Sequence, residues 1–162
     1  MSTAVDLSLT VNGERVTRRI EARRHLIDFL RLDLGFMGTH AGCEHGMCGA
    51  CTVRVDGKIV RGCLVLAASL EGAQVETIEG VSDSGEIRDL QDAFIARNAC
   101  QCGYCTPGML LTAADLLSFN PRPSRAEIRE HLSGNYCRCT GYHAIVDAVA
   151  ATAAKRSGGA GR

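Results

Sequence analysis

The residues best suited to do chemistry in this 162-residue chain are its nine cysteines. Four lie in the first half of the chain and five in the second. Thiolates are soft ligands that suit zinc and iron-sulfur clusters. In a reducing compartment thiol pools keep cysteine pairs reduced, so metal ligation or redox catalysis is a more usual role than a disulfide. The division predicts one metal centre in each half of the chain.

The cysteines of the first half have the spacing C-x4-C-x2-C-x11-C and are Cys43, Cys48, Cys51 and Cys63. The first three lie in the segment GCEHGMCGAC, and their spacing is that of plant-type 2Fe-2S ferredoxins. Its glycines allow the backbone to wrap closely enough to offer N–H groups to the sulfurs of a cluster. Structural zinc instead favours two close pairs around a separate loop. The pattern therefore indicates a 2Fe-2S cluster.

The second half has a C-x2-C pair, Cys102 and Cys105, and a C-x-C pair, Cys137 and Cys139, each just before an expected helix. We expect the two helix starts to face each other. A helix amino terminus carries partial positive charge and unpaired N–H donors, which favour thiolates and an anionic cluster. Taken alone this set also suits zinc, but beside the ferredoxin-like loop a second 2Fe-2S cluster is the better interpretation.

Four further residues near these motifs are of types that can bind a metal. Cys100 is expected to be a free thiol, with competition for a metal during assembly as the alternative. Histidine replaces cysteine at one iron of Rieske centres. Because both sets already contain four cysteines, we expect His40, His45 and His143 to be loop or surface residues.

The first half of the chain has the alternating pattern of β-strands. Asn12-Gly13 and Asp56-Gly57 are dipeptides suited to two-residue hairpin turns. The expected elements are strands over 5–11, 16–20, 52–55, 58–61 and 74–78, and a short helical run around 26–30.

The second half has helical periodicity throughout. Thr106 followed by Pro107 is expected to cap a helix that ends at Asn120-Pro121. Ser124 and Glu127 have capping-box spacing for the next helix. Apolar stripes predict a helix through 87–94 and a last one through 145–152.

These patterns predict an α+β fold in two parts. Residues 1–78 form a ferredoxin-like domain, 79–86 (EGVSDSGE) a polar linker, 87–156 a helical domain and 157–162 a flexible tail. Each domain is small for an independent core, so each would gain from a metal that ties its loops together.

Charge and hydropathy exclude several classes of protein. Eighteen basic residues balance eighteen acidic ones, so no nucleic-acid surface is indicated. No stretch approaches the roughly 18 apolar residues of a membrane span, and the segment MSTAVDLSLTVNGERV lacks the basic region followed by an apolar region that is typical of a secretory leader. We therefore expect a cytoplasmic protein without a membrane span.

Three segments occur in order: GCEHGMCGACTV, QCGYCTPGM and GNYCRCTGY. On these motifs the chain resembles the small 2Fe-2S subunit of the xanthine dehydrogenase family of molybdenum hydroxylases, as in carbon monoxide dehydrogenase and aryl-CoA reductase. The likeness runs from the first hairpin to about Ala150. It implies a β-grasp ferredoxin domain followed by an all-α four-helix domain.

The resemblance also implies roles for the cysteines. The set from Cys43 to Cys63 would hold the cluster nearer the flavin, and the set from Cys102 to Cys139 the one beside the molybdenum cofactor. Gln101 and Cys139 would contact the pterin of that cofactor, although Gln101 could also be an ordinary loop cap. No catalytic residue is expected in this chain, because substrate would be oxidised on a partner.

The implied partners are a large molybdopterin-binding subunit and a medium FAD-binding subunit, in a heterotrimer or a dimer of heterotrimers. They would be separate chains, since this one has no Rossmann-like or P-loop glycine motif. The alternatives are a free-standing ferredoxin-like electron carrier and a zinc-stabilised interaction module. Balanced charge favours a permanent interface over a carrier that docks transiently.

Overall fold

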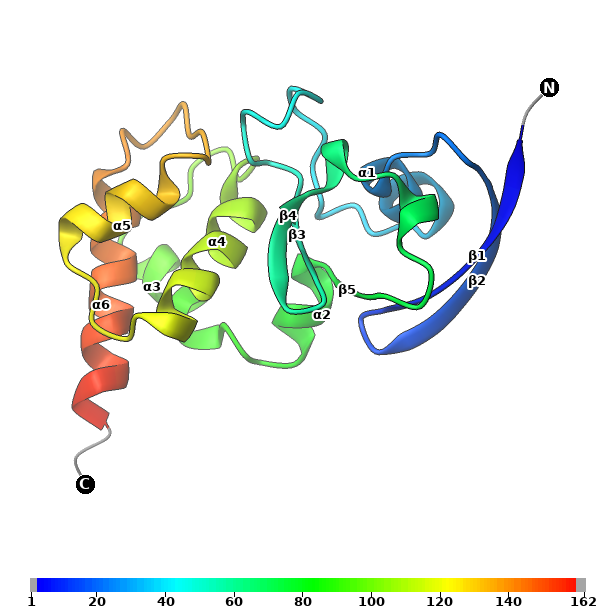
Figure 1. The fold of residues 1–162 in the computed structure, drawn as a ribbon. Helices are drawn as coiled ribbons and strands as arrows, with labels where there is room; N and C mark the ends of the chain where they lie inside the picture. The colour runs from blue at the N-terminus through cyan, green and yellow to red at the C-terminus, as the bar shows by residue number, and fades with distance from the viewer. Residues whose placement is uncertain (1–2, 160–162) are drawn as a thin grey trace.

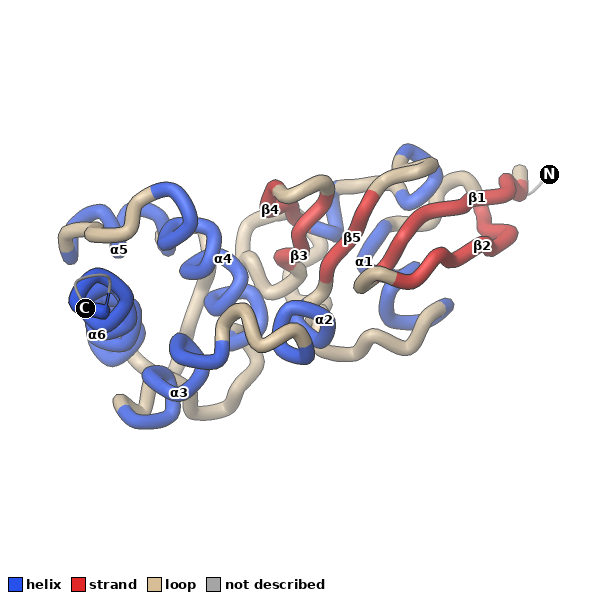
Figure 2. Tube along the Cα trace, turned by 90° about the horizontal axis from the view of Figure 1, so that it is seen from below, coloured by secondary structure: helices blue, strands red, loops and turns tan. Residues whose placement is uncertain are grey.

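The computed structural model describes residues 3–159 and contains two parts that lie side by side. Strands gather toward the N-terminal end of the molecule and the longer helices toward the C-terminal end (Figures 1 and 2). This arrangement confirms the α+β prediction. No helix in the described range is both long and apolar enough to cross a membrane.

The N-terminal part is built on a five-stranded mixed sheet with the order β2-β1-β5-β3-β4. Its strands are β1 (Ala4–Val11), β2 (Glu14–Glu21), β3 (Thr52–Val55), β4 (Lys58–Arg61) and β5 (Gln74–Glu76). β5 runs parallel to β1 and antiparallel to β3. Both predicted hairpins are present, and their Asn-Gly and Asp-Gly turns have the positive φ angles that tight hairpin turns require.

Short helical segments cover this sheet and complete its core. They are α1 (Leu26–Asp28), η1 (Phe29–Asp33), η2 (Gly62–Leu64) and η3 (Ala67–Ser69). Leu26, Phe29 and Leu30 are fully buried against the apolar face of β1. Burying large apolar side chains is what stabilises a small sheet of this kind.

The segment between the two parts differs from its predicted form. β5 ends at Glu76, and α2 (Ile78–Asp83) occupies most of the stretch that was expected to be a linker. Ile78 and Val81 lie three positions apart and are buried in the helical core, which explains a helix in a polar sequence. Its start is held by Asn12, whose side chain accepts a hydrogen bond from the Thr77 N–H at 2.8 Å.

The C-terminal part is a cluster of helices. These are α3 (Arg88–Ala96), α4 (Thr106–Phe119), α5 (Arg125–Leu132) and α6 (His143–Gly159). α4 is buried along most of its length and lies between the other helices and the strands β3 and β4 (Figure 2). The predicted capping box at Ser124 and Glu127 is present at the start of α5.

Two helix ends differ from the sequence prediction. Thr106 is not an N-cap: the helical conformation already includes Cys105, and no side chain caps α4. The predicted flexible tail is helical as far as Gly159, and residues 160–162 lie outside the described range. Tertiary contact overrides the low helix propensity of Gly158 there, since the Ser157 hydroxyl donates to the Pro121 carbonyl oxygen at 3.2 Å.

Candidate metal centres

The eight cysteines of the two spaced motifs meet in pairs. We call Cys43, Cys48, Cys51 and Cys63 the first cysteine site, and Cys102, Cys105, Cys137 and Cys139 the second. In the first site Cys43 lies against Cys48, and Cys51 against Cys63. In the second site Cys105 lies against Cys137, and the Sγ atoms of Cys102 and Cys139 are 3.5 Å apart.

Pairwise grouping is the donor arrangement that a two-iron cluster needs, because each iron takes two protein ligands. The donor set of each site, four thiols in two pairs, therefore fits a 2Fe-2S cluster.

The loop of the first site wraps around its outer pair of cysteines. Glu44, Gly46 and Gly49 have positive φ angles, which turn the backbone inward. As a result the N–H groups of His45 and Cys48 donate to the Cys43 Sγ at 3.4 and 3.3 Å. These hydrogen bonds, His45 first, lower the pKa of the Cys43 thiol to about 6. The loop thus favours a thiolate at its mouth.

The inner pair of the first site is buried. Cys51 is 2% exposed and Cys63, in η2, is 4% exposed, and both pack against Ile27. Burial raises the pKa of the Cys51 thiol to about 11. The raised pKa keeps the proton on this thiol, because a buried thiolate needs a positive partner. Binding of a metal here would therefore release protons.

The second site lies where two loops meet before α4 and α6. Cys102 and Cys139 are exposed, whereas Cys105 and Cys137 are partly covered. Burial raises the pKa of Cys105 to about 12. For Cys137 burial acts in the same direction and is the largest single influence, but hydrogen bonds with Thr140, Cys139 and Cys105 together outweigh it and lower the pKa. The Thr140 hydroxyl oxygen lies 3.1 Å from the Cys137 Sγ.

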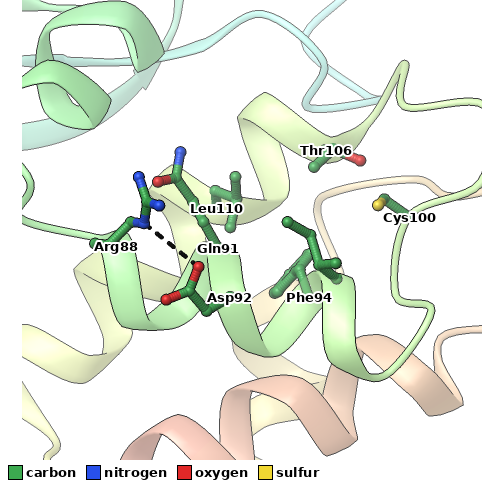
Figure 3. A pocket seen from close by; sticks show the side chains of 8 residues that line it. Arg88, Gln91, Asp92, Phe94, Cys100, Thr106 and Leu110 are labelled. Atoms are coloured by element: carbon green, nitrogen blue, oxygen red, sulfur yellow. Dashed lines mark ion pairs between the residues drawn. The ribbon is translucent and has the colours of Figure 1, made fainter.

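The structure places the other residues singled out in the sequence around these pairs. Gln101 is exposed beside Cys102. Cys100 lines a pocket formed with side chains of α3 and α4, among them Phe94 and Leu110 (Figure 3). His143 lies 3.6 Å from the Asp147 carboxylate, on the exposed side of α6.

His40 and Tyr104 form a contact between the two sites that the sequence did not reveal. Their rings stack with centroids 4.6 Å apart, and the His40 Nδ1 lies 2.7 Å from the Tyr104 carbonyl oxygen. The Tyr104 hydroxyl donates to the carbonyl oxygen of Ala41. Tyr104 precedes Cys105, so the loop of the second site is held against the loop of the first.

A second contact joins the two sites. The Tyr136 N–H donates to the Cys48 carbonyl oxygen at 2.8 Å. Asn135, which is 1% exposed, donates to the carbonyl oxygen of Gly49 at 3.2 Å. Sequence reasoning missed Asn135, although its place in the segment GNYCRC beside two cysteines was a signal that could have found it.

Two family models match the chain over overlapping ranges. Residues 33–95 match a 2Fe-2S iron-sulfur cluster binding domain and residues 77–150 match a second 2Fe-2S binding domain. The curated relatives include the nicotine 6-hydroxylase small subunit of Paenarthrobacter nicotinovorans, 50% identical over 91% of this chain and 89% of the relative. Another is the caffeine dehydrogenase subunit gamma of Pseudomonas sp. strain CBB1, 48% identical over 88% of this chain and 87% of the relative.

Solved structures give the same result. A chain of quinoline 2-oxidoreductase from Pseudomonas putida 86 superposes with a TM-score of 0.90 at 47% identity, covering 99% of both chains. The aldehyde oxidoreductase from Desulfovibrio gigas superposes with a TM-score of 0.87 at 42% identity, over 96% of this chain but 17% of that one. The same unit therefore occurs both as a separate chain and inside a much longer one.

Proposed function

Because the chain belongs to the 2Fe-2S small subunits of the molybdenum hydroxylases, the xanthine dehydrogenase family, we propose that it is the electron-transfer subunit of a heteromeric enzyme. It relays electrons from the molybdenum cofactor of one partner, through two 2Fe-2S clusters, to FAD on another. The family assignment made from its three cysteine motifs is confirmed, and with it the role as part of a molybdenum-dependent oxidoreductase.

The pairwise meeting of eight thiols carries this proposal. We assign one cluster to the first cysteine site and one to the second, each held by its four cysteines. When bound, such a cluster takes up and releases one electron at a time. The chain contributes the ligands, their burial and the hydrogen bonds that tune the potential.

The exposed pair of the second site supports a molybdenum partner on this side of the chain. Cys102 and Cys139 lie at the surface beside Gln101. A side-chain amide can donate and accept at a pterin edge, and a thiolate ligand in contact with the pterin gives a short path for electrons. We therefore propose that Gln101 and Cys139 contact the molybdopterin cofactor of the large subunit.

The surface around the first site carries exposed apolar side chains and suits a protein partner other than the molybdenum subunit. Met47 and Leu64, each next to a cysteine of this site, are 59% and 62% exposed. The Leu64 side chain packs against Gly46, the neighbour of Met47. Met47 and Leu64 therefore form one apolar rim over the first loop. Exposed apolar groups in one place mark interaction surfaces. We propose that the FAD-binding subunit covers this rim.

The two partners are proposed to be separate chains that assemble with this one into a heterotrimer, alone or doubled. The nicotine 6-hydroxylase relative is named as a small subunit, which supports larger partners. We propose that the complex lies in the reducing cytoplasm, where thiols stay available as metal ligands.

The test is the composition of the complex recovered with the affinity-tagged chain from its native host. We expect about four irons per chain, with molybdenum and FAD in a constant ratio to it. Four irons without molybdenum or flavin would overturn the proposal in favour of a free-standing ferredoxin-like electron carrier. Zinc in place of iron would instead favour an interaction module.

A further inference from the structure

The two cysteine sites meet at a junction of three glycines. Gly49 belongs to the first loop, Gly108 to the first turn of α4, and Gly134 to the loop before Cys137. A Cβ atom at Gly108 would overlap the Gly49 carbonyl oxygen, and one at Gly134 would lie 2.8 Å from an Arg61 nitrogen. The backbones at this junction are therefore as close as glycine allows.

The side chain of Asn135 fills the centre of this junction and uses both ends of its amide. Its Nδ2 donates to the Gly49 carbonyl oxygen at 3.2 Å. Its Oδ1 accepts from the Arg61 guanidinium at 3.0 Å and from the Thr112 hydroxyl at 3.2 Å. One buried amide thus ties together the first loop, the end of β4 and the middle of α4. If any of these groups lost its partner, the folded state would be destabilised by the free energy of burying a polar group without a hydrogen bond.

The junction lies between cysteines of opposite sites. Gly49 directly follows Cys48, and Asn135 precedes Cys137 by two positions. Between them the Tyr136 N–H donates to the Cys48 carbonyl oxygen. A shift at Asn135 would therefore move one site relative to the other, rather than distort either loop alone.

We propose that Asn135 is a positioning residue that fixes the separation of the two cysteine sites and thereby sets how readily electrons pass between them. This inference rests on the proposed function, because it requires a cluster at each site. Neither an apolar residue nor aspartate can replace the amide. The first offers no hydrogen bonds, and a carboxylate would face the Gly49 carbonyl oxygen without a proton to donate.

Two substitutions in the full chain test the role, one polar and one steric. Asn135→Asp keeps the shape and the acceptor for Arg61 but loses the donor to Gly49. Gly108→Ala keeps the Asn135 amide, but its added Cβ would overlap the Gly49 carbonyl oxygen and lie 3.2 Å from the Asn135 Nδ2, so it pushes the first loop away from α4. Gly158→Ala is the matched control, since Gly158 is also a helical glycine but an added Cβ meets nothing within 4 Å.

The readout is iron content together with the electron paramagnetic resonance (EPR) spectrum of the fully reduced chain. Two clusters at fixed separation split each other's signals, and this splitting weakens steeply with distance. In both test variants we expect iron to stay at about four per chain while the splitting shrinks. Passage of electrons between the sites should slow as well.

An unchanged splitting in both variants would overturn the inference. So would a loss of iron in step with a fall in melting temperature in both, because Asn135 would then serve folding alone. If the unsubstituted chain holds only about two irons, the two-cluster proposal fails, and this inference fails with it. If the unsubstituted chain shows the split spectrum and neither variant changes the splitting, only the role of Asn135 is rejected.

Discussion

The two cysteine sites share a ligand type and a pairwise arrangement but differ in how deeply the chain buries them. In the first site Cys51 and Cys63 belong to the core, and only the outer pair approaches the surface. In the second site the inner pair is only partly covered and the outer pair is exposed. In the proposed relay, exposure rather than ligand identity therefore distinguishes the site assigned to receive electrons from the site assigned to pass them on.

The difference has a local cause in the sequence. The first loop is rich in glycine, so its backbone can wrap around the ligands and donate N–H groups to them. The second site is made by two short loops that lead into α4 and α6, and its outer cysteines are exposed. We propose that a partner covers them.

Removing the second site should have the largest effect. Cys137→Ser takes away an inner ligand, so we expect the complex to lose about half of its iron and to stop oxidising substrate with the flavin-linked acceptor. The measurement is iron content with steady-state turnover. Cys100→Ser is the matched control and should leave both unchanged, because Cys100 belongs to neither site. Turnover in Cys137→Ser would contradict the serial path.

Exposure also predicts the order in which the isolated chain loses its clusters. With a strong iron chelator, the second-site cluster should be lost well before the first, since its outer ligands are open to solvent. The two losses can be followed by EPR, and the assembled complex should protect the second site. Simultaneous loss would show that burial does not distinguish the sites.

The surfaces around the sites should separate the two partners. Gln101→Ala should weaken retention of molybdenum cofactor in the recovered complex but not of FAD. Leu64→Ser should do the reverse, because Leu64 belongs to the apolar rim of the first site. Both side chains are exposed, so thermal stability should change little, by less than about 0.5 kcal/mol. Equal loss of both cofactors in either variant would reject the assignment of faces.

The smallest effect on electron transfer is expected at the ion pair that joins the two parts. Arg54 in β3 reaches Glu86, before α3, at 2.8 Å and is mostly buried. Arg54→Met should cost about 1–2 kcal/mol, discounted for the exposure of the carboxylates. Arg19→Met removes an exposed pair with Asp6 at 3.9 Å and should cost almost nothing. Chemical denaturation compares the two, and equal costs would contradict a stabilising link.

Most of the fold could be predicted because its signals are local. Alternation, turn dipeptides and the Ser124 capping box each act within a few residues, and the strands and the start of α5 follow from them. α2 was missed because its two apolar anchors are spaced among polar residues and gain their burial only from the helical core. The N-cap of α4 was wrongly assigned to Thr106, because the conformation of Cys105 depends on the loop before it.

The ligand motifs could also be predicted because their signals are local, whereas the contact between the two sites could not. Spacing alone indicates which cysteines share a site, but Asn135 and Gly49 are 86 positions apart and meet only in the folded chain. Tyr104 and Ala41 likewise belong to different loops, 63 positions apart. No periodicity or spacing rule relates such residues, so their interaction required the structure.

The most direct test is whether the two sites hold distinct clusters that can be removed one at a time. In the full chain with bound iron and sulfide, two EPR signals should appear on reduction. Cys51→Ser should remove only one of them, and Cys137→Ser only the other. A single signal in the unsubstituted chain, or loss of the same signal in both variants, would contradict the account.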